Sequence, residues 1–206
     1  MNADVDIINY GIGNIRSVEN AILKLNFKSK VILNPAELKN SKKIILPGIG
    51  SFSAAVKLLN EGGWIEAIKE QVLEKNKLLF GICLGMQLLG TNSEEHGLSN
   101  GLNLIPGQIK DLKNLGCKNK LPQIGWNNVK IKKEHKYLKD IPDLSDFYFV
   151  NSLVYIPSNS DHIIGTTDYD INFCSIISYK NIFGTQFHPE KSSKAGLKIL
   201  QNFLNA

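Results

Sequence analysis

The chain has 206 residues, of which 43% are hydrophobic and 21% charged, and these ordinary globular values exclude disordered, collagen-like and coiled-coil proteins. Lys, Asn or Gly interrupts every apolar run before it reaches the ~20 residues of a membrane span, and no basic region precedes an apolar one at the N-terminus. We therefore expect a single domain over residues 1–206, with no signal peptide and no membrane contact, in the cytoplasm.

The net charge of +5 raises the question of whether nucleic acid is a partner. Only one of the 24 basic residues is an arginine, Arg16, and the densest basic stretch, residues 130–136, contains no Phe, Tyr or Trp. We therefore expect no nucleic-acid binding. We interpret the basic stretch as a solvent-exposed edge strand whose lysines oppose aggregation.

The first half of the chain alternates short apolar runs with segments whose apolar residues recur every three or four positions. This alternation predicts a parallel sheet with helices on its faces. Pro47-Gly48 is expected to end the third strand, and the apolar fourth strand is expected to be buried on both faces. The predicted strands cover residues 5–9, 30–33, 43–46 and 77–82, and the predicted helices cover 15–25, 51–59, 65–73 and 86–89.

After about residue 91, strands follow one another through short polar turns, which predicts antiparallel pairing added to the parallel sheet. A final amphipathic helix is predicted at 195–203. The predicted fold class is therefore α/β, with a central, mostly parallel sheet, helices on both faces and an antiparallel β extension. The strands of the extension are predicted at 104–109, 127–131, 147–155, 163–167, 173–179 and 182–187.

A cysteine flanked by glycines, Cys83 in Gly81-Ile82-Cys83-Leu84-Gly85, stands where the fourth predicted strand meets a helix. This G-x-C-x-G pattern is the thiol counterpart of the nucleophile elbow, in which glycines permit a strained turn and the helix N-terminus stabilises negative charge. The alternative is a small buried hydrophobe at a strand end. Cys117 and Cys174 lack this context, and without any C-x-x-C pair we expect free thiols and no metal site.

His188-Pro189-Glu190 follows the last predicted strand. A thiol nucleophile needs an imidazole to take its proton and a carboxylate to hold the imidazole's tautomer, and the intervening proline restricts the backbone between two such groups. Because Cys83 and His188 both follow predicted sheet strands, where α/β folds gather functional groups, we interpret His188 as the base and Glu190 as its orienter. The alternative is a surface histidine in a turn.

The third predicted strand leads into Pro47-Gly48-Ile49-Gly50, where glycines let backbone N–H groups approach a ligand closely. Attack of a nucleophile on a carbonyl carbon creates an oxyanion, which two preorganised N–H donors stabilise. We predict one donor near Ile49 or Gly50 and a second from Leu84. The alternative is an ordinary Pro-Gly turn.

Taken together, residues 46–50, the elbow at 81–87 and residues 187–190 resemble the motifs of the class I, or triad-type, glutamine amidotransferases. Within this family the chain is most similar to the glutaminase subunits of imidazole glycerol phosphate synthase, which act in histidine biosynthesis. The resemblance implies a flavodoxin-like fold, L-glutamine as substrate, a synthase subunit as heterodimer partner and no cofactor. Its specific parts are residues 9–18, 125–127, 146–150 and 188–192, within a match that runs from Asn9 to Leu204.

The resemblance also implies roles for individual residues. Cys83 matches the family's nucleophile, His188 its base and Glu190 the orienting carboxylate. A carboxylate at position 95 suits the α-ammonium group of glutamine, and the backbone around Asn151 would face its α-carboxylate. The positions that bind glutamine match Gly48, Gln87, Glu95, Asn151 and Ser152, and those at the partner interface or ammonia passage match Asn14, Trp126 and Lys191.

Two segments depart from the family's common sequence. Where members commonly read Pro-His-Met-Gly-Trp-Asn and Val-His-Ser-Tyr, this chain has other residues at Gln123, Asn151 and Leu153. These positions lie outside the predicted triad, so we expect a glutaminase that supplies ammonia to a synthase subunit making imidazole glycerol phosphate and AICAR. Two alternatives stay open: a glutaminase feeding a sugar amidotransferase of surface-polysaccharide synthesis, and a non-catalytic subunit that stabilises a partner.

Overall fold

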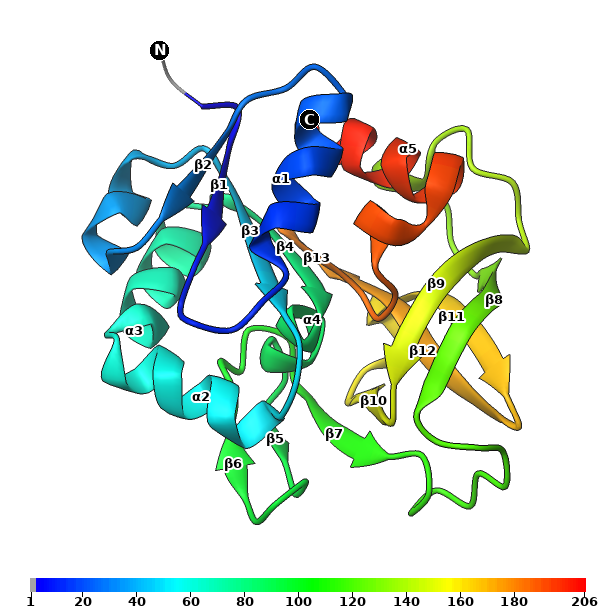
Figure 1. Cartoon of the computed structure of the whole chain (residues 1–206). Helices are drawn as coiled ribbons and strands as arrows, with labels where there is room; N and C mark the ends of the chain where they lie inside the picture. The colour runs from blue at the N-terminus through cyan, green and yellow to red at the C-terminus, as the bar shows by residue number, and fades with distance from the viewer. Residues whose placement is uncertain (1–2) are drawn as a thin grey trace.

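The structure is a computed structural model that describes residues 3–206 (Figure 1). Five parallel strands form one half of its sheet in the order β2-β1-β3-β4-β13. Nearly all the residues of β3, β4 and β13 are buried, as expected for strands covered on both faces. These strands are β1 (Val5–Ile8), β2 (Ser29–Ile32), β3 (Lys43–Gly48), β4 (Leu78–Cys83) and β13 (Ile182–Thr185).

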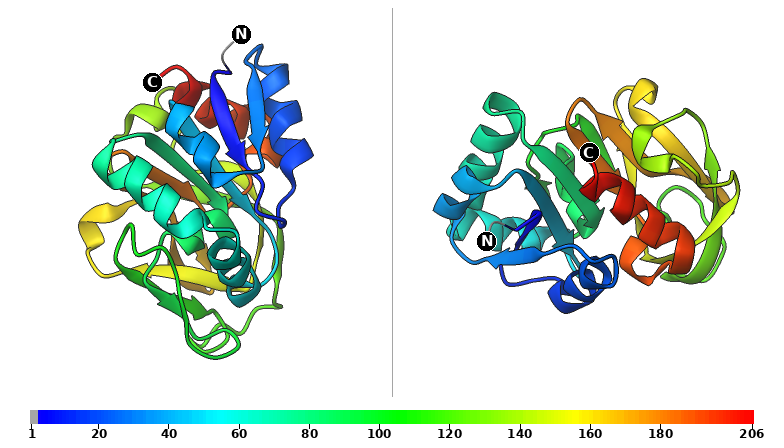
Figure 2. Two further views of the ribbon diagram at one scale, coloured as in Figure 1. Left: turned by 90° about the vertical axis from the view of Figure 1, so that its left-hand side faces the viewer. Right: turned by 90° about the horizontal axis from the view of Figure 1, so that it is seen from above.

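Helices cover both faces of the parallel strands (Figures 1 and 2). Neighbouring residues of β4 serve opposite faces, with Phe80 in the core under α1 and α5 and Leu79 in the core under α2 and α3, because side chains alternate along a strand. No helix within residues 3–206 has both the length and the apolar character needed to cross a membrane. The helices are α1 (Ile15–Lys24), α2 (Phe52–Glu61), α3 (Trp64–Lys69), α4 (Leu84–Leu88) and α5 (Ser193–Leu204).

Antiparallel strands extend the sheet beyond β13, through β12, β10 and β7, to a small hairpin of β5 and β6. From β12 a branch of β11, β8 and β9 curls back toward α5 (Figure 1), where Phe147 stacks on Phe187 at 4.1 Å between ring centroids. The strands are β5 (Asn92–Ser93), β6 (Ser99–Asn100), β7 (Gly107–Asp111), β8 (Gln123–Ile131), β9 (Ser145–Asn151), β10 (Leu153–Pro157), β11 (Ile163–Tyr169) and β12 (Ile171–Tyr179). Single helical turns lie at Pro35–Asn40, Glu70–Glu74, Lys136–Leu138, Ser160–His162 and Pro189–Lys191.

The predicted fold class is confirmed, since the sheet is mixed, parallel in its first half and antiparallel in its extension except for the short parallel pair of β5 and β7. The prediction that Pro47-Gly48 ends the third strand is wrong, because β3 continues to Gly48. β1 pairs with β3 only as far as Ile45, so beyond that point one side of β3 has no ladder to maintain and tolerates a proline. The longer strand brings Gly48 level with Cys83, its partner in β4.

Other strand predictions in the extension are also wrong in part. The predicted strand 147–155 is two strands, β9 and β10, which are separated at Ser152. The strand predicted at 104–109 is β7, which begins later, because Leu104 and Ile105 are buried core residues of a loop. β8 begins at Gln123 and pairs with β9 and β11 on its two sides, so it is no edge strand, although the lysines of the basic stretch 130–136 are exposed as expected.

Candidate active site

Cys83 is the last residue of β4 and stands in a sharp turn immediately before α4. Its φ of 55° and ψ of −113° lie in a region that residues with a side chain normally avoid, at a cost of about 1–3 kcal/mol. The flanking glycines permit this turn. A Cβ at Gly81 would lie 2.7 Å from the carbonyl oxygen of Gly85, and a Cβ at Gly85 would overlap the carbonyl oxygen of Leu46. Cys83 therefore has the backbone geometry of a nucleophile elbow.

His188 and Glu190 form a buried pair beside this elbow, just after β13, the parallel neighbour of β4. Nδ1 of His188 lies 2.9 Å from Oε1 of Glu190, and the two side chains are 4% and 1% exposed. Burial by itself lowers the pKa of His188, but the negative charges of Cys83 and Glu190 outweigh it and raise that pKa above its usual range. Because Nδ1 is bonded to the carboxylate, Nε2 is the nitrogen left to exchange a proton with the sulfur.

Cys83 and His188 open into one cavity of about 240 Å³. Drug-sized ligands occupy cavities of roughly 300–1,000 Å³, so this smaller space suits a small metabolite. Pro122, Val150 and Leu153 contribute to the lining without having been predicted as site residues. The predicted site residues that line it are Ile49, Gly50, Leu84, Gln87, Glu95, Asn151 and Ser152.

The two backbone segments predicted to supply oxyanion donors both line the cavity that Cys83 opens into. Leu84 opens α4, and the N–H groups of a first helical turn have no acceptor within their own helix. Ile49 and Gly50 form an exposed loop after β3, where Gly50 adopts a φ of +93°. Gly48, by contrast, lies behind the cavity in a narrow crevice that Asn14 and Glu190 also line. The segments that contain the predicted oxyanion donors, Leu84 and the Ile49-Gly50 loop, therefore share one cavity with Cys83.

Glu95 brings a carboxylate to the cavity and is itself held in place by α2. Its Oε2 accepts hydrogen bonds from the backbone N–H of Phe52 at 2.7 Å and from the Ser51 hydroxyl at 3.0 Å. This side chain therefore fixes the start of α2 as well as placing negative charge at the cavity wall.

The geometry is that of a thiol and an imidazole that open into one small cavity, with a carboxylate behind the imidazole, and a family comparison agrees with it. The family model described as glutamine amidotransferase class-I matches residues 6–206. This chain belongs to the class I glutamine amidotransferases.

Individual members of the family are similar over the whole length of this class I glutamine amidotransferase. It is 44% identical to the imidazole glycerol phosphate synthase subunit HisH of Chlorobium luteolum, with 97% of this chain and 98% of that protein covered. It is 43% identical to the subunit of the same name from Desulfitobacterium hafniense, with 97% and 92% covered. The solved structure of PurLQS from Thermotoga maritima is similar in fold, with a TM-score of 0.75 at 18% identity over 100% of this chain and 99% of that chain.

The residues matched to the partner face of class I glutamine amidotransferases lie outside the cavity. Trp126 is 54% exposed, and its ring centroid lies 6.1 Å from that of Tyr148. Nζ of Lys191 lies 5.9 Å from the same Tyr148 ring. Asn14 caps α1 through the N–H of Ser17 and borders the crevice beside Glu190. The structure thus groups Trp126 and Lys191 around one aromatic ring and places Asn14 next to the buried pair.

Two of the departures from the family's common sequence, Gln123 and Asn151, are direct cross-strand partners in β8 and β9. They are 2% and 6% exposed. Among the described residues, Nε2 and Oε1 of Gln123 and Oδ1 of Asn151 have no hydrogen-bond partner. Two neutral amides are therefore neighbours at positions where the family commonly has two histidines. Asn151 lines the cavity, Gln123 lies behind it, and neither belongs to the predicted triad.

The sequence analysis missed Gln186. It is fully buried, and its Nε2 lies 3.8 Å from Sγ of Cys83. Its Oε1 accepts a hydrogen bond of 3.0 Å from Nε2 of Gln87, so the Gln87 amide is engaged inside the protein as well as lining the cavity. Side chains two positions apart in an extended segment share a side, and the spacing of Gln186 from His188 was the signal that could have found it.

The remaining thiols and histidines lie away from the cavity. Burial raises the pKa of the Cys174 thiol, and the Cys117 thiol donates to the carbonyl oxygen of Tyr169. His135 stacks on Phe183, and burial lowers the pKa of this imidazole to about 4. Within residues 3–206 no group of three or more His, Cys, Asp or Glu side chains is placed to hold a metal ion.

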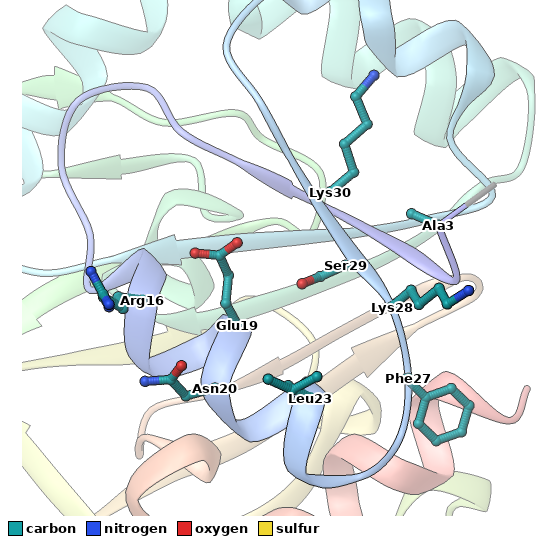
Figure 3. Close-up of a pocket in the computed structure, with 9 residues that line it drawn as sticks. All are labelled: Ala3, Arg16, Glu19, Asn20, Leu23, Phe27, Lys28, Ser29 and Lys30. Atoms are coloured by element: carbon teal, nitrogen blue, oxygen red, sulfur yellow. The ribbon is translucent and has the colours of Figure 1, made fainter. Parts of the chain in front are cut away.

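A wider hollow of about 610 Å³ lies at the other end of the sheet, between α1 and β2 (Figure 3). Its basic side chains are Arg16, Lys28 and Lys30, and Figure 3 shows their charged ends pointing in different directions. Its lining includes neither a cysteine nor a histidine. We therefore assign no chemistry to this hollow.

Proposed function

We propose that this chain is the glutaminase subunit of an imidazole glycerol phosphate synthase, acting in the cytoplasm in histidine biosynthesis. It hydrolyses L-glutamine to glutamate and ammonia and passes the ammonia to a synthase subunit that forms imidazole glycerol phosphate and AICAR. The observation that carries the chemistry is the strained Cys83 elbow facing His188, with Glu190 behind it, in one cavity. Relatives that are 40–44% identical and named as HisH subunits support the choice of pathway.

The first half of the reaction forms a thioester. The Cys83 sulfur gives its proton to Nε2 of His188 and attacks the carboxamide carbon of glutamine. The resulting oxyanion is stabilised by N–H groups of Leu84 and of the Ile49-Gly50 loop. As the tetrahedral intermediate collapses, the C–N bond breaks, and the leaving nitrogen takes the proton from His188 and departs as ammonia.

The second half releases glutamate. His188, now neutral, takes a proton from a water molecule, which attacks the thioester carbon. The C–S bond breaks, and the sulfur leaves as a thiolate that faces the His188 imidazolium again. Glu190 supports both halves, because its carboxylate on Nδ1 fixes the imidazole's tautomer and stabilises the cation each time it forms.

Glutamine is held in this proposal by charge and backbone at the far wall of the cavity. The Glu95 carboxylate binds the α-ammonium group, while the backbone around Asn151 and Ser152 faces the α-carboxylate. Charged hydrogen bonds of this kind contribute about 1.5–3 kcal/mol each, so the loss of one weakens binding about 10- to 100-fold.

We expect Glu95→Gln to raise the KM for glutamine about 10-fold or more with little change in kcat. The substituted amide keeps an oxygen for the N–H of Phe52 and the hydroxyl of Ser51 but loses the charge that binds the ammonium group. Glu95→Ala should also lower the free energy of unfolding by about 1 kcal/mol, since the start of α2 loses its cap. Steady-state kinetics in the presence of the synthase subunit, together with thermal unfolding, measure both effects.

Glu94→Gln is the matched control for this prediction. Its carboxylate is 65% exposed and pairs with Lys110 at 3.4 Å, outside the cavity. We expect its KM and Tm to stay near those of the unchanged chain. An unaltered KM in Glu95→Gln would remove Glu95 from the glutamine site.

The partner surface in this proposal is the patch of Ile124, Trp126, Tyr148 and Lys191 on β8, β9 and the turn after His188. Ile124 is 63% exposed and Trp126 54% exposed, which is unusual for large apolar side chains on one strand. Exposed aromatic anchors of this type dominate the binding energy of protein interfaces. The patch borders Glu190 in the chain, so a synthase subunit bound there would lie close to the site that releases ammonia.

Reconstitution with candidate partners tests the proposed function. Mixed with a histidine-pathway synthase subunit, the chain should form a heterodimer and support glutamine-dependent formation of imidazole glycerol phosphate; mixed with a sugar amidotransferase it should not. Trp126→Ala should weaken the heterodimer at least 10-fold, whereas Leu33→Ala should have no effect, since this apolar side chain is also well exposed, at 70%, but follows β2 at a distant edge of the sheet. Glutamine-dependent product with the sugar enzyme alone, or no glutamate release with any partner, would refute the proposal.

A further inference from the structure

A chain of buried amides leads from the backbone of β10 to the nucleophile. The carbonyl oxygen of Leu153 accepts a hydrogen bond of 3.2 Å from Nε2 of Gln87. The same Gln87 nitrogen donates to Oε1 of Gln186 at 3.0 Å, and Nε2 of Gln186 lies 3.8 Å from Sγ of Cys83. Gln87 is 4% exposed and Gln186 is fully buried, so water does not compete for these bonds.

The chemistry of the groups fixes which end of each amide faces the sulfur. A backbone carbonyl only accepts, so Gln87 must turn its NH₂ group toward Leu153. That NH₂ group has a second hydrogen, which faces Gln186, so Gln186 must present its oxygen to Gln87 and its own NH₂ group to Cys83. Cys83 therefore faces the NH₂ group of Gln186. The carbonyl oxygen of Leu153 sets the direction of this donor by orienting Gln87, which in turn orients Gln186.

Two neutral polar groups lie at the same distance from the Cys83 sulfur and favour opposite protonation states. The carbonyl oxygen of Val150, at 3.8 Å, accepts a hydrogen bond from the neutral thiol. The NH₂ group of Gln186, also at 3.8 Å, donates, and a thiolate binds a donor more strongly than a thiol does. When Cys83 transfers its proton to His188, the hydrogen bond to the Val150 carbonyl is lost, and the hydrogen bond from Gln186 becomes the favourable one for the sulfur.

We propose that Gln186, held in orientation by Gln87, is a fixed hydrogen-bond donor to the Cys83 thiolate and so favours the reactive form of the nucleophile. This inference rests on the proposed function, because it adds a group to the same site. Gln186 touches the reacting sulfur, whereas Gln87 acts through it as a positioning residue. The thiolate that leaves when the thioester is hydrolysed receives the same donor.

The charged and titratable groups around the sulfur come from several elements. His188, with Glu190 behind it, follows β13, and Glu95 lines the cavity beside α2. Tyr10 follows β1; its buried hydroxyl has a raised pKa, through burial first and through the charge on Cys83 second. Gln186 holds its amide nitrogen 3.8 Å from the sulfur, so removing this donor should change the protonation equilibrium of Cys83 directly.

Alkylation of Cys83 by iodoacetamide, followed by peptide mass spectrometry across a pH series, tests the proposal without glutamine or a partner. Gln186→Met keeps a similar side-chain length and removes the N–H donor. We expect its Cys83 to react about 10-fold more slowly at pH 7, with the pH midpoint of alkylation about one unit higher. In the heterodimer its kcat for glutamine hydrolysis should fall about 10-fold with the KM nearly unchanged.

Two further variants make the result decisive. Gln87→Met leaves Gln186 in place but frees the Gln186 amide to turn, so the pH midpoint of Cys83 alkylation should rise by a smaller amount. If Gln186→Met does not fold, the result of Gln87→Met tests the proposal instead. Ser175→Ala is the control. Ser175 is fully buried, and its carbonyl oxygen accepts a hydrogen bond from the backbone N–H of Gln186, but its hydroxyl has no partner among the described residues. Its alkylation profile should be unchanged.

An unshifted pH midpoint in folded Gln186→Met, or in Gln87→Met where it decides, would overturn the proposal. A fall in kcat with an unshifted midpoint would do the same, since it would mark a merely structural role. A different result would refute the proposed function: no glutamate release by the unchanged chain in its heterodimer. In that case the alkylation profile would still test whether Gln186 favours the Cys83 thiolate.

Discussion

Cys83→Ala should abolish glutamine-dependent synthesis by the heterodimer while leaving synthesis from added ammonium salts intact. Glutamine is split only through a bond to the sulfur, whereas free ammonia bypasses that step and reaches the synthase subunit directly. We expect glutamate release to fall on the order of 10⁴-fold or more, as when other nucleophiles of catalytic triads are removed. Paired assays with glutamine and with ammonium, on the same preparation, measure the two activities.

Chemical labelling provides an independent check on the same residue. A diazo-ketone analogue of glutamine should attach to Cys83 and leave Cys117 and Cys174 unmodified. The Cys117 thiol donates a hydrogen bond to the carbonyl oxygen of Tyr169, and burial raises the pKa of the Cys174 thiol. Peptide mass spectrometry locates the adduct. Normal glutamate release by Cys83→Ala, or an adduct on another thiol with activity lost, would show that the nucleophile is misassigned.

His188→Ala should lower kcat about 10²- to 10⁴-fold, the usual contribution of a general base, with little change in the KM for glutamine. Glu190→Gln should cost less, because the amide keeps the shape and a hydrogen bond to Nδ1 but loses the charge. Neither side chain is proposed to hold glutamine in place, so both effects should appear in kcat. Steady-state kinetics with the synthase subunit present compare the two variants.

The alkaline limb of the pH profile of Glu190→Gln should also move to lower pH. The Glu190 carboxylate is one of the charges that raise the pKa of His188, so its loss lowers that pKa. The imidazolium then loses its proton at a lower pH, and the activity that depends on it falls earlier as the pH rises. An unchanged alkaline limb, or greater damage in Glu190→Gln than in His188→Ala, would contradict the roles assigned to this pair.

Local sequence was sufficient where the physical requirement is itself local. The elbow at Cys83 needs two glycines at fixed offsets because backbone atoms occupy the space that their side chains would fill, and the pattern is legible in five residues. Likewise, His188 and Glu190 stand two positions apart around a proline, and the structure finds them 2.9 Å apart. The apolar periodicity predicted the α/β order for the same reason, since each strand and helix must bury its own face.

Interactions between distant segments were not predictable in this way. Gln186 and Cys83 are 103 positions apart and come together only because β13 pairs with β4 after the whole antiparallel extension has intervened. The apolar residues Leu104 and Ile105 were predicted to belong to a strand although they lie in a loop. Loops and strands that are buried in the core both need apolar side chains, so the sequence pattern does not distinguish them.

By itself, then, the sequence predicted a candidate nucleophile, base and carboxylate and the order of the strands and helices that present them. The tertiary structure decided which groups face the sulfur, that Glu95 also caps α2, and that Gln123 and Asn151 are cross-strand partners. The physical reason is that strand pairing between remote segments depends on burying all faces of the sheet at once, a condition that no single stretch of residues contains.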